Sequence, residues 1–197
     1  MASFTRGFAG RRREVDPDLP PGQTLVRDWP VLSAGATPYV DRDEWSFSIA
    51  TETGAVHTWN WAEVQALGPQ DITVDIHCVT HWSKLGMAWR GVSLDRLFED
   101  VDTSYDYCMA HSYGGYTTNV PLAELLDGQA WVAFEADGEP LTPEHGGPAR
   151  LLVPHLYFWK SAKWLRGIVM QETDEPGFWE NAGYNLHGDP WKEERYW

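Results

Sequence analysis

The residues of this sequence best suited to chemistry are two cysteines, each followed at the third position by a histidine. Cys78 and His81 form one Cys-x-x-His pair, and Cys108 and His111 form the other. Two such pairs can supply the ligands of a tetrahedral Cys2His2 zinc site. Both pairs are expected at strand ends within apolar sequence, however, where buried structural cysteines are common. A zinc-stabilised binding module and a pair of structural cysteines therefore both remain open.

A cationic segment in an acidic chain is the second candidate. The formal net charge is -14, and residues 145–171 contain no carboxylate. This segment carries four cations, Arg150, Lys160, Lys163 and Arg166. Gly146 and Gly147 would let the backbone approach a ligand closely, and a guanidinium can hold a phosphate with two hydrogen bonds. The segment indicates either an anion-binding site or a surface loop whose cations pair with acidic neighbours.

The composition restricts the possible partners. The hydrophobic fraction of 43% and the twelve tryptophans predict a packed globular fold, in which some of the large rings could wall a ligand cleft. The negative charge argues against nucleic acid or an anionic membrane as the main partner. Since no apolar run is long enough to span a bilayer, no membrane segment is expected. A small-molecule substrate is the favoured partner.

The N-terminus suggests a location. Arg11, Arg12 and Arg13 could indicate a twin-arginine export signal, but such a signal needs an apolar stretch next. The residues that follow include Glu14, Asp16 and Asp18. We therefore expect a basic, solvated arm and a cytoplasmic protein.

Alternation of apolar and polar residues predicts the strands that position these groups. Strands are expected over residues 45–49, 56–59, 72–78, 105–110, 130–136, 150–153 and 167–171. Short helices are expected from Asn60 to Leu67, from Ser93 to Phe98 and after Pro121. The order has no βαβ rhythm, so the sequence predicts an α+β fold. We expect a single domain over residues 1–197, with residues 1–29 as an extended N-terminal arm, and Cys78 at the end of a strand.

Two longer motifs resemble those of the sulfite oxidase superfamily of molybdopterin-dependent oxidoreductases. The first is His-Cys-Val-Thr-His-Trp-Ser-Lys at residues 77–84, followed by Trp-Arg-Gly-Val at 89–92. It is similar to the Cys-Val-x-x-Trp-Ser form in the catalytic subunit of bacterial methionine-sulfoxide reductase. The second is Gly-Pro-Ala-Arg-Leu-Leu-Val-Pro at 147–154, followed by Trp-Lys-Ser-Ala-Lys-Trp-Leu at 159–165. The resemblance spans roughly residues 30–190 and implies a mixed-sheet, sulfite-oxidase-type fold.

The resemblance implies a molybdenum–molybdopterin cofactor and oxygen-atom transfer on a small sulfoxide- or sulfite-like substrate, with an electron donor or acceptor protein. It implies that Cys78 binds the metal and that Arg150 holds the phosphate end of the pterin. The further cofactor contacts that it implies are Ser33, Ala34, Ser112, His145, Ser161, Ala162 and Lys163. Tyr184 matches the active-site tyrosine.

His81 is a catalytic candidate on its position alone. It lies three residues after Cys78, and an imidazole can pass a proton near neutral pH. The alternative is a structural histidine.

One departure from the sulfite oxidase pattern concerns the substrate. Sulfite oxidases carry arginines after the cysteine and before the tyrosine. Here the corresponding stretches are Thr80–Trp82 and Asn181–Ala182, which argues against an anionic sulfite pocket.

Overall fold

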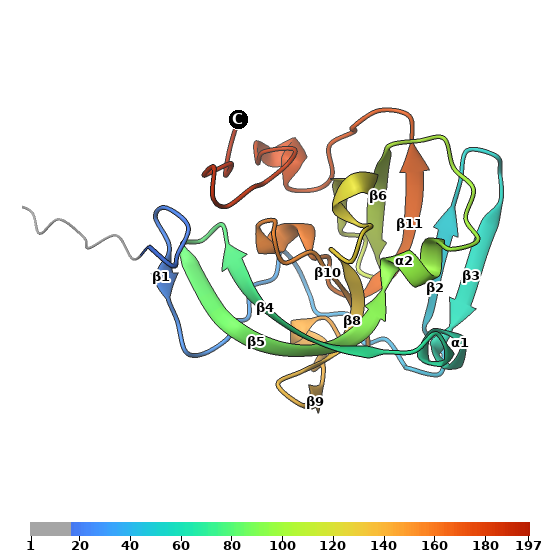
Figure 1. Ribbon diagram of the computed structural model, residues 1–197, viewed down its shortest axis with the longest axis horizontal. Coiled ribbons are helices and arrows are strands. Elements are labelled where there is room, and N and C mark those ends of the chain that lie inside the picture. The colour runs from blue at the N-terminus through green and yellow to red at the C-terminus, as the bar shows by residue number, and fades with distance from the viewer. Residues whose placement is uncertain (1–16) are drawn as a thin grey trace, which may run out of the picture.

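A computed structural model describes residues 17–197, which form two β-sheets with a few short helices (Figure 1). This confirms the predicted α+β class with mixed sheets. Arg11–Arg13 and the first part of the predicted arm lie outside the described residues. No helix within residues 17–197 has the length and apolar character needed to cross a membrane.

The first sheet is organised around one long, curved strand, β5 (Figure 1). It pairs in parallel with β1 and antiparallel with β4 and β8, while β10 and β9 pair with β8. The strands are β1 (Thr24–Leu25), β4 (Gln70–Cys78), β5 (Trp82–Ser93), β8 (Trp131–Ala136), β9 (Glu139–Pro140) and β10 (Arg150–Leu152). The predicted strand that ends at Cys78 is present as β4.

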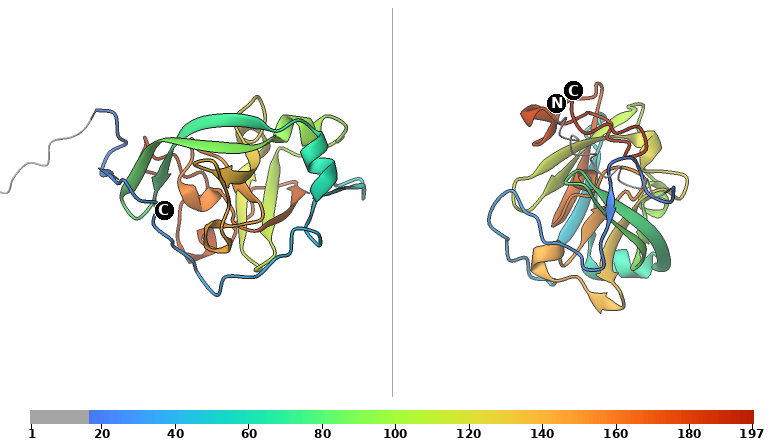
Figure 2. Two further views of the ribbon diagram at one scale, coloured as in Figure 1. Left: turned by 90° about the horizontal axis from the view of Figure 1, so that it is seen from below. Right: turned by 90° about the vertical axis from the view of Figure 1, so that its left-hand side faces the viewer.

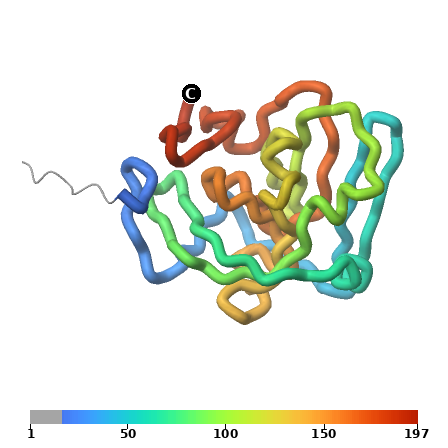
Figure 3. The backbone as a smooth tube through the Cα atoms, in the orientation of Figure 1, coloured from blue at the N-terminus to red at the C-terminus, as the bar shows by residue number. Residues whose placement is uncertain are grey.

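The second sheet has the order β3-β2-β11-β6-β7. Its strands are β2 (Ser46–Ala50), β3 (Val56–Asn60), β6 (Tyr107–Ser112), β7 (Thr117–Pro121) and β11 (Leu165–Gln171). Strand β11 runs parallel to β2 and antiparallel to β6. Residues 26–44, which we call the crossing segment, lead from β1 in the first sheet to β2 in the second (Figure 3). Figure 2 shows the two sheets from two further sides.

The helices are short and connect strands. They are α1 (Trp61–Ala66), α2 (Leu94–Phe98), η1 (Leu122–Glu124), η2 (Pro143–His145), η3 (Phe158–Lys160) and η4 (Glu180–Ala182). The predicted cap at Asn60 is confirmed, because its side chain accepts from the Glu63 backbone N–H at 3.0 Å. The Glu63 carboxylate in turn accepts from the Asn60 backbone N–H at 2.8 Å. The predicted helix after Pro121 is only the 3-10 turn η1. Asp127 and Gly128 both have left-handed backbone angles, which turn the chain into β8.

Strand β5 was not predicted, because its buried residues do not alternate cleanly with exposed ones. Ser83 and Trp82 are both buried, and the polar residues Lys84 and Arg90 interrupt the apolar pattern. Gly91 marks the close approach of β5 to β8. A Cβ atom at this position would lie 2.6 Å from the Val132 carbonyl oxygen, so only glycine fits there.

Two apolar clusters hold the sheets together. The larger one contains residues of both sheets, including Phe47 and Ile49 of β2 and Leu151 of β10. The smaller one surrounds Cys78 and is rich in aromatic rings, among them Trp82 and Trp159. Four buried tryptophans belong to this smaller cluster, whereas others, such as Trp45, lie in the larger one.

The last part of the chain, residues 176–197, packs back onto the body of the protein; we call it the C-terminal segment. His187 lies between two carboxylates, with Nδ1 2.7 Å from Glu194 and Nε2 3.0 Å from Glu124. Burial disfavours the charged form of this ring, but hydrogen bonds to the two carboxylates raise its pKa. The segment lies at the same end of the molecule as β1 (Figure 1).

Candidate active site

A cavity of about 550 Å³ lies where the crossing segment, the end of β4, the loop before β11 and the C-terminal segment meet. A volume of this order is typical of pockets for small molecules and cofactors. Its walls come from within residues 29–36, 78–82, 114–116, 150, 158–164 and 178–184.

Cys78 lines this cavity at the end of β4 and is 8% exposed. A tight turn follows it, in which the His81 backbone N–H donates to the Cys78 carbonyl at 3.1 Å. Burial raises the pKa of the thiol, and the Thr80 hydroxyl, 3.1 Å from the sulfur, partly opposes this effect. A bound metal cation would instead favour the thiolate.

Arg150 lines the cavity from β10 and is 1% exposed. Its two terminal nitrogens donate to backbone carbonyls, to His145 at 2.8 Å and to Ser161 at 2.6 Å. Burial lowers its pKa to about 9. None of the ion pairs within residues 17–197 includes Arg150, so its charge lacks an anionic partner in this part of the chain.

Lys163 is the second cation of the cavity wall. Its ammonium donates to the Leu32 and Glu144 carbonyls at 2.7 and 2.6 Å. Burial and the positive charge of Arg150 lower its pKa to about 8. Gly146 makes this packing possible, because a Cβ there would lie 2.9 Å from that of Lys163 and its φ is 105°. Two neighbouring cations that form no ion pair within residues 17–197 can hold an anion.

Four further residues predicted as cofactor contacts line the same cavity: Ser33, Ala34, Ser161 and Ala162. Lys163 holds the crossing segment in place, since its ammonium also lies 3.2 Å from the Ser33 hydroxyl. The Ser161 hydroxyl accepts from the Val153 backbone N–H at 2.9 Å and thereby fixes the loop.

Three predicted residues do not line the cavity. The exposed His81 ring lies 3.0 Å from the Gly22 carbonyl. His145 stacks on Trp29, a lining residue, with ring centroids 3.8 Å apart, and its carbonyl accepts from Arg150. Ser112 is buried, and its hydroxyl has no hydrogen-bond partner within residues 17–197. The turn after Ser112 supplies the cavity wall instead.

Tyr184 reaches the cavity from the C-terminal segment. Its ring stacks on Trp179 with centroids 5.0 Å apart and meets Trp159 edge-on at 5.1 Å. Burial raises the pKa of its hydroxyl, and the neighbouring Tyr196 and Cys78 add to this effect. The hydroxyl therefore stays protonated at neutral pH and can donate a hydrogen bond.

The aromatic walls of the cavity could not be assigned to particular residues from the sequence. Trp82, Tyr116, Phe158, Trp159 and Trp179 all line the cavity. The high tryptophan count was the only signal for them, and it did not say which rings would face a ligand.

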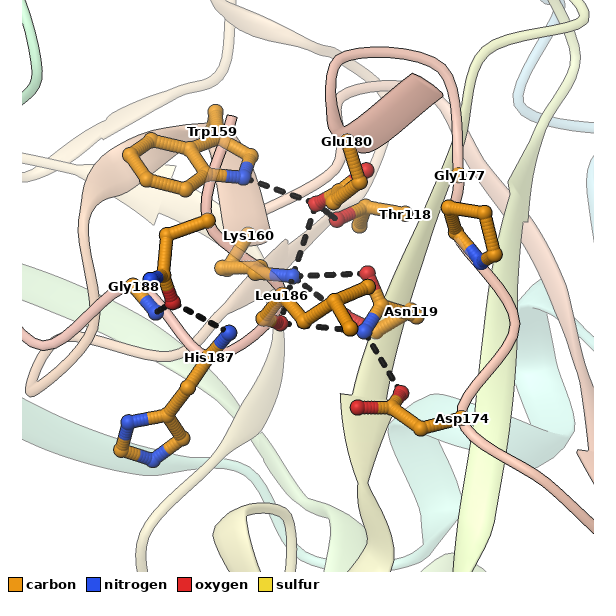
Figure 4. A network of polar contacts seen from close by, with 12 residues as sticks. Thr118, Asn119, Trp159, Lys160, Asp174, Gly177, Glu180, Leu186, His187 and Gly188 are labelled. Carbon is orange, nitrogen blue, oxygen red and sulfur yellow. Dashed lines mark hydrogen bonds and ion pairs between the residues drawn. The ribbon is translucent and has the colours of Figure 1, made fainter. Parts of the chain in front are cut away.

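Lys160 does not belong to the anion site, which corrects the expectation for the cationic segment. It is fully buried and forms an ion pair with Glu180 at 2.7 Å (Figure 4). Its ammonium also donates to the Asn119 carbonyl at 2.9 Å and to the Leu186 carbonyl at 2.6 Å. Glu180 accepts from the Trp159 indole N–H at 2.8 Å (Figure 4). This network joins the loop that carries Ser161 to the C-terminal segment.

Arg166 is likewise outside the cavity wall. It is exposed, and its guanidinium lies over the Tyr113 ring at 5.8 Å. The anion site is therefore formed by Arg150 and Lys163 alone among the four predicted cations.

The zinc alternative is not supported. Cys78 lies in the first sheet, whereas Cys108 is buried in β6 of the second, where its thiol donates to the Val120 carbonyl at 3.1 Å. Within residues 17–197 no group of three or more His, Cys, Asp and Glu side chains is arranged to hold a metal ion. Cys108 is a buried structural cysteine.

Comparison with known protein families identifies the family of the chain. The family described as the oxidoreductase molybdopterin binding domain matches residues 34–179, which include Cys78, Arg150 and Lys163. The chain belongs to this family. The protein is therefore an oxidoreductase with a molybdenum–molybdopterin cofactor, as the motifs implied.

Individual relatives agree with this assignment. The chain is 40% identical to the uncharacterized oxidoreductase YuiH of Bacillus subtilis over 194 residues, covering 96% of this chain and 98% of YuiH. It is 26% identical to a protein of Azospira oryzae provisionally named protein-methionine-sulfoxide reductase subunit YedZ1, over 76% of this chain and 57% of that protein. The sulfane dehydrogenase SoxCD of Paracoccus pantotrophus has the same fold, with a TM-score of 0.63 and 15% identity over 87% of this chain and 57% of that chain.

The residues of the cavity fit a molybdopterin cofactor. Arg150 and Lys163 present two positive charges that form no ion pair within residues 17–197, which suits the pterin phosphate. The Cys78 sulfur offers the soft ligand that a metal held by dithiolene sulfurs favours. The cavity volume of about 550 Å³ lies within the range found for cofactor sites.

We expect Arg150→Ala to lower cofactor occupancy rather than the rate per bound molybdenum. A charge-assisted hydrogen bond contributes about 1.5–3 kcal/mol, so affinity should fall by roughly 10- to 100-fold. Molybdenum and pterin content of the purified variant measure this, with Arg96→Ala, an exposed arginine of α2 outside the cavity, as control. Full occupancy in Arg150→Ala at limiting cofactor would contradict the assignment.

Proposed function

We propose that the protein transfers an oxygen atom between a small neutral sulfoxide and water. The observation that carries this proposal is the distribution of charge in the cavity. Arg150 and Lys163 are the only cations among its described lining residues, and we assign both to the cofactor phosphate. No cation of the wall is then left to hold an anionic substrate such as sulfite.

The walls around Cys78 support a neutral substrate. Trp159, Trp179 and Tyr184 pack against one another and face the cavity on its C-terminal side. Aromatic faces bind apolar and weakly polar groups well. A methyl sulfoxide has small apolar substituents and one strong hydrogen-bond acceptor, its oxygen.

We assign the following roles to the chain. When bound, the molybdenum–pterin cofactor supplies the two-electron oxidation and reduction. Cys78 binds the metal, and Arg150 and Lys163 hold the phosphate end. Tyr184 orients the substrate by donating its hydroxyl proton in a hydrogen bond to the sulfoxide oxygen. In the reductive direction the S–O bond breaks, and two electrons and two protons convert the sulfoxide into a sulfide and water.

This reduction needs an electron donor. We propose that a separate electron-carrying protein supplies the electrons. We also propose a cytoplasmic location, which the two unpaired cysteines support because reduced thiols are typical of that compartment.

Steady-state kinetics with artificial electron carriers test the proposed substrate. Dimethyl sulfoxide reduction is measured with a reduced viologen, and sulfite oxidation with ferricyanide, on protein of known molybdenum content. Each missing charged hydrogen bond should weaken sulfite binding by roughly 10- to 100-fold, so saturation is expected with the sulfoxide only. Efficient sulfite oxidation with a low KM, together with no sulfoxide reduction, would refute the proposal.

We expect Tyr184→Phe to retain molybdenum but slow sulfoxide reduction by roughly 2- to 10-fold, because one neutral hydrogen bond contributes about 0.5–1.5 kcal/mol. The ring packing against Trp159 and Trp179 survives this change. The measurement is kcat/KM per molybdenum. Tyr39→Phe, which removes an exposed hydroxyl that is not part of the cavity wall, is the matched control. Equal kcat/KM in wild type and Tyr184→Phe would remove Tyr184 from the mechanism.

A further inference from the structure

The turn at residues 78–81, which we call the cysteine turn, accepts hydrogen bonds on its backbone from side chains near both ends of the described chain. Arg195 donates from Nη1 to the Val79 carbonyl at 2.7 Å. Gln23 donates from its amide nitrogen to the Cys78 carbonyl at 3.0 Å. The carbonyls of two successive peptides, Cys78–Val79 and Val79–Thr80, are therefore both held by distant parts of the sequence.

Arg195 itself is rigidly placed. It is 7% exposed, its second terminal nitrogen donates to the Pro21 carbonyl at 3.1 Å, and its guanidinium lies 4.9 Å from the centre of the Tyr157 ring. It takes part in none of the ion pairs within residues 17–197. A buried arginine that contacts only backbone carbonyls and a ring serves to position those groups, because its planar guanidinium fixes the direction of both hydrogen bonds.

The segment that carries Arg195 is anchored on both sides. Tyr184 and Tyr196 form a β-bridge, and the Asn185 backbone N–H donates to the Arg195 carbonyl at 3.2 Å. The preceding residue, Glu194, holds His187 at 2.7 Å. The guanidinium therefore approaches Val79 from a fixed support.

We propose that Arg195 is a positioning residue for the metal-binding cysteine. By holding the Val79 and Pro21 carbonyls together, it fixes the orientation of the Val79–Thr80 peptide. Because Gln23 holds the preceding Cys78–Val79 peptide, the two contacts together set the direction in which the Cys78 sulfur enters the cavity. Arg195 does not line the cavity, and its hydrogen bond to the site is to the backbone of the turn. The inference rests on the proposed role of Cys78 as the molybdenum ligand.

Residues that orient a metal ligand can tune a metal site without touching the metal. Removing the guanidinium should leave Cys78 in place but allow its side chain to adopt several orientations. The expected result is a protein that still takes up molybdenum, whose metal signal is altered, and whose apo form exposes the thiol more often.

The test uses the full chain with Arg195→Gln and Arg195→Lys, and Lys192→Gln as a control for charge in the same segment. In apo protein, alkylation of Cys78 by iodoacetamide should accelerate by roughly 10-fold or more in Arg195→Gln. In holoprotein, the molybdenum EPR spectrum should shift or broaden at near-wild-type molybdenum content. Arg195→Lys keeps the charge but cannot bind two carbonyls in a fork, so it should show a smaller change of the same kind.

Wild-type EPR spectra and alkylation rates in Arg195→Lys and Arg195→Gln would overturn the proposal. If Arg195→Gln does not fold, Arg195→Lys alone decides, and an unchanged spectrum in it counts against a positioning role. Holoprotein carrying Cys78→Ser separates this inference from its premise. If that variant retains the wild-type EPR spectrum, Cys78 is not the ligand and the premise fails.

Discussion

Replacing Lys160 by methionine is expected to lower the free energy of unfolding by about 3–5 kcal/mol. The methionine fills most of the space, but it leaves the Glu180 carboxylate buried without its cation. The Asn119 and Leu186 carbonyls also lose a donor. Urea denaturation followed by fluorescence measures the loss.

The control for this prediction is a more exposed ion pair. Lys84 lies 2.6 Å from Asp137, whose side chain is 54% exposed, and Lys84→Met should cost about 0–1 kcal/mol. The double variant Lys160→Met with Glu180→Gln should recover part of the stability, because the uncompensated charge is gone. If Lys160→Met and Lys84→Met cost the same, the buried pair does not stabilise the fold as argued.

Replacing Cys78 by serine is expected to reduce turnover per molybdenum by at least about 100-fold while the fold is retained. Changes in residues that only support metal ligands cost about 10- to 100-fold, so loss of a ligand should cost more. A serine oxygen is a harder ligand than a thiolate and alters the electronic properties of the metal. The measurement combines kcat, metal analysis and thermal unfolding.

Cys108→Ser provides the matched control, since it makes the same substitution in β6, away from the cavity. Its turnover per molybdenum should stay near that of the wild type, although burying a hydroxyl can lower stability. Equal losses of turnover in the two variants would argue against Cys78 as the metal ligand.

The sequence predicted best those parts of the site that lie within short motifs. Cys78 was placed at a strand end by alternation, and Arg150 and Lys163 stood out as cations in a stretch without carboxylates. Their environment in the structure agrees with these assignments, although the cofactor contacts of individual residues remain predictions. Strand β5 could not be predicted in the same way, because it packs on both faces and breaks the alternation.

The positions of other residues could not be predicted because they depend on partners far away in the sequence. Lys160 looked like its neighbour Lys163 in sequence, but its partner Glu180 lies 20 residues further along the chain and removes it from the anion site. Arg195 carries no local signal at all, since 116 residues separate it from Val79. His81 follows Cys78 closely, yet the tight turn directs its ring to Gly22.

The separation between Val79 and Arg195 also has a consequence for biosynthesis. A ribosome makes the cysteine turn 116 residues before the arginine that supports it. Tyr184 and the Glu180 partner of Lys160 are likewise made after both cofactor motifs. While the chain is still being translated, the cysteine turn lacks this support and one wall of the cavity is missing. Insertion of the cofactor is therefore expected to follow release of the C-terminal segment from the exit tunnel, so that loading is a late, post-translational step in maturation.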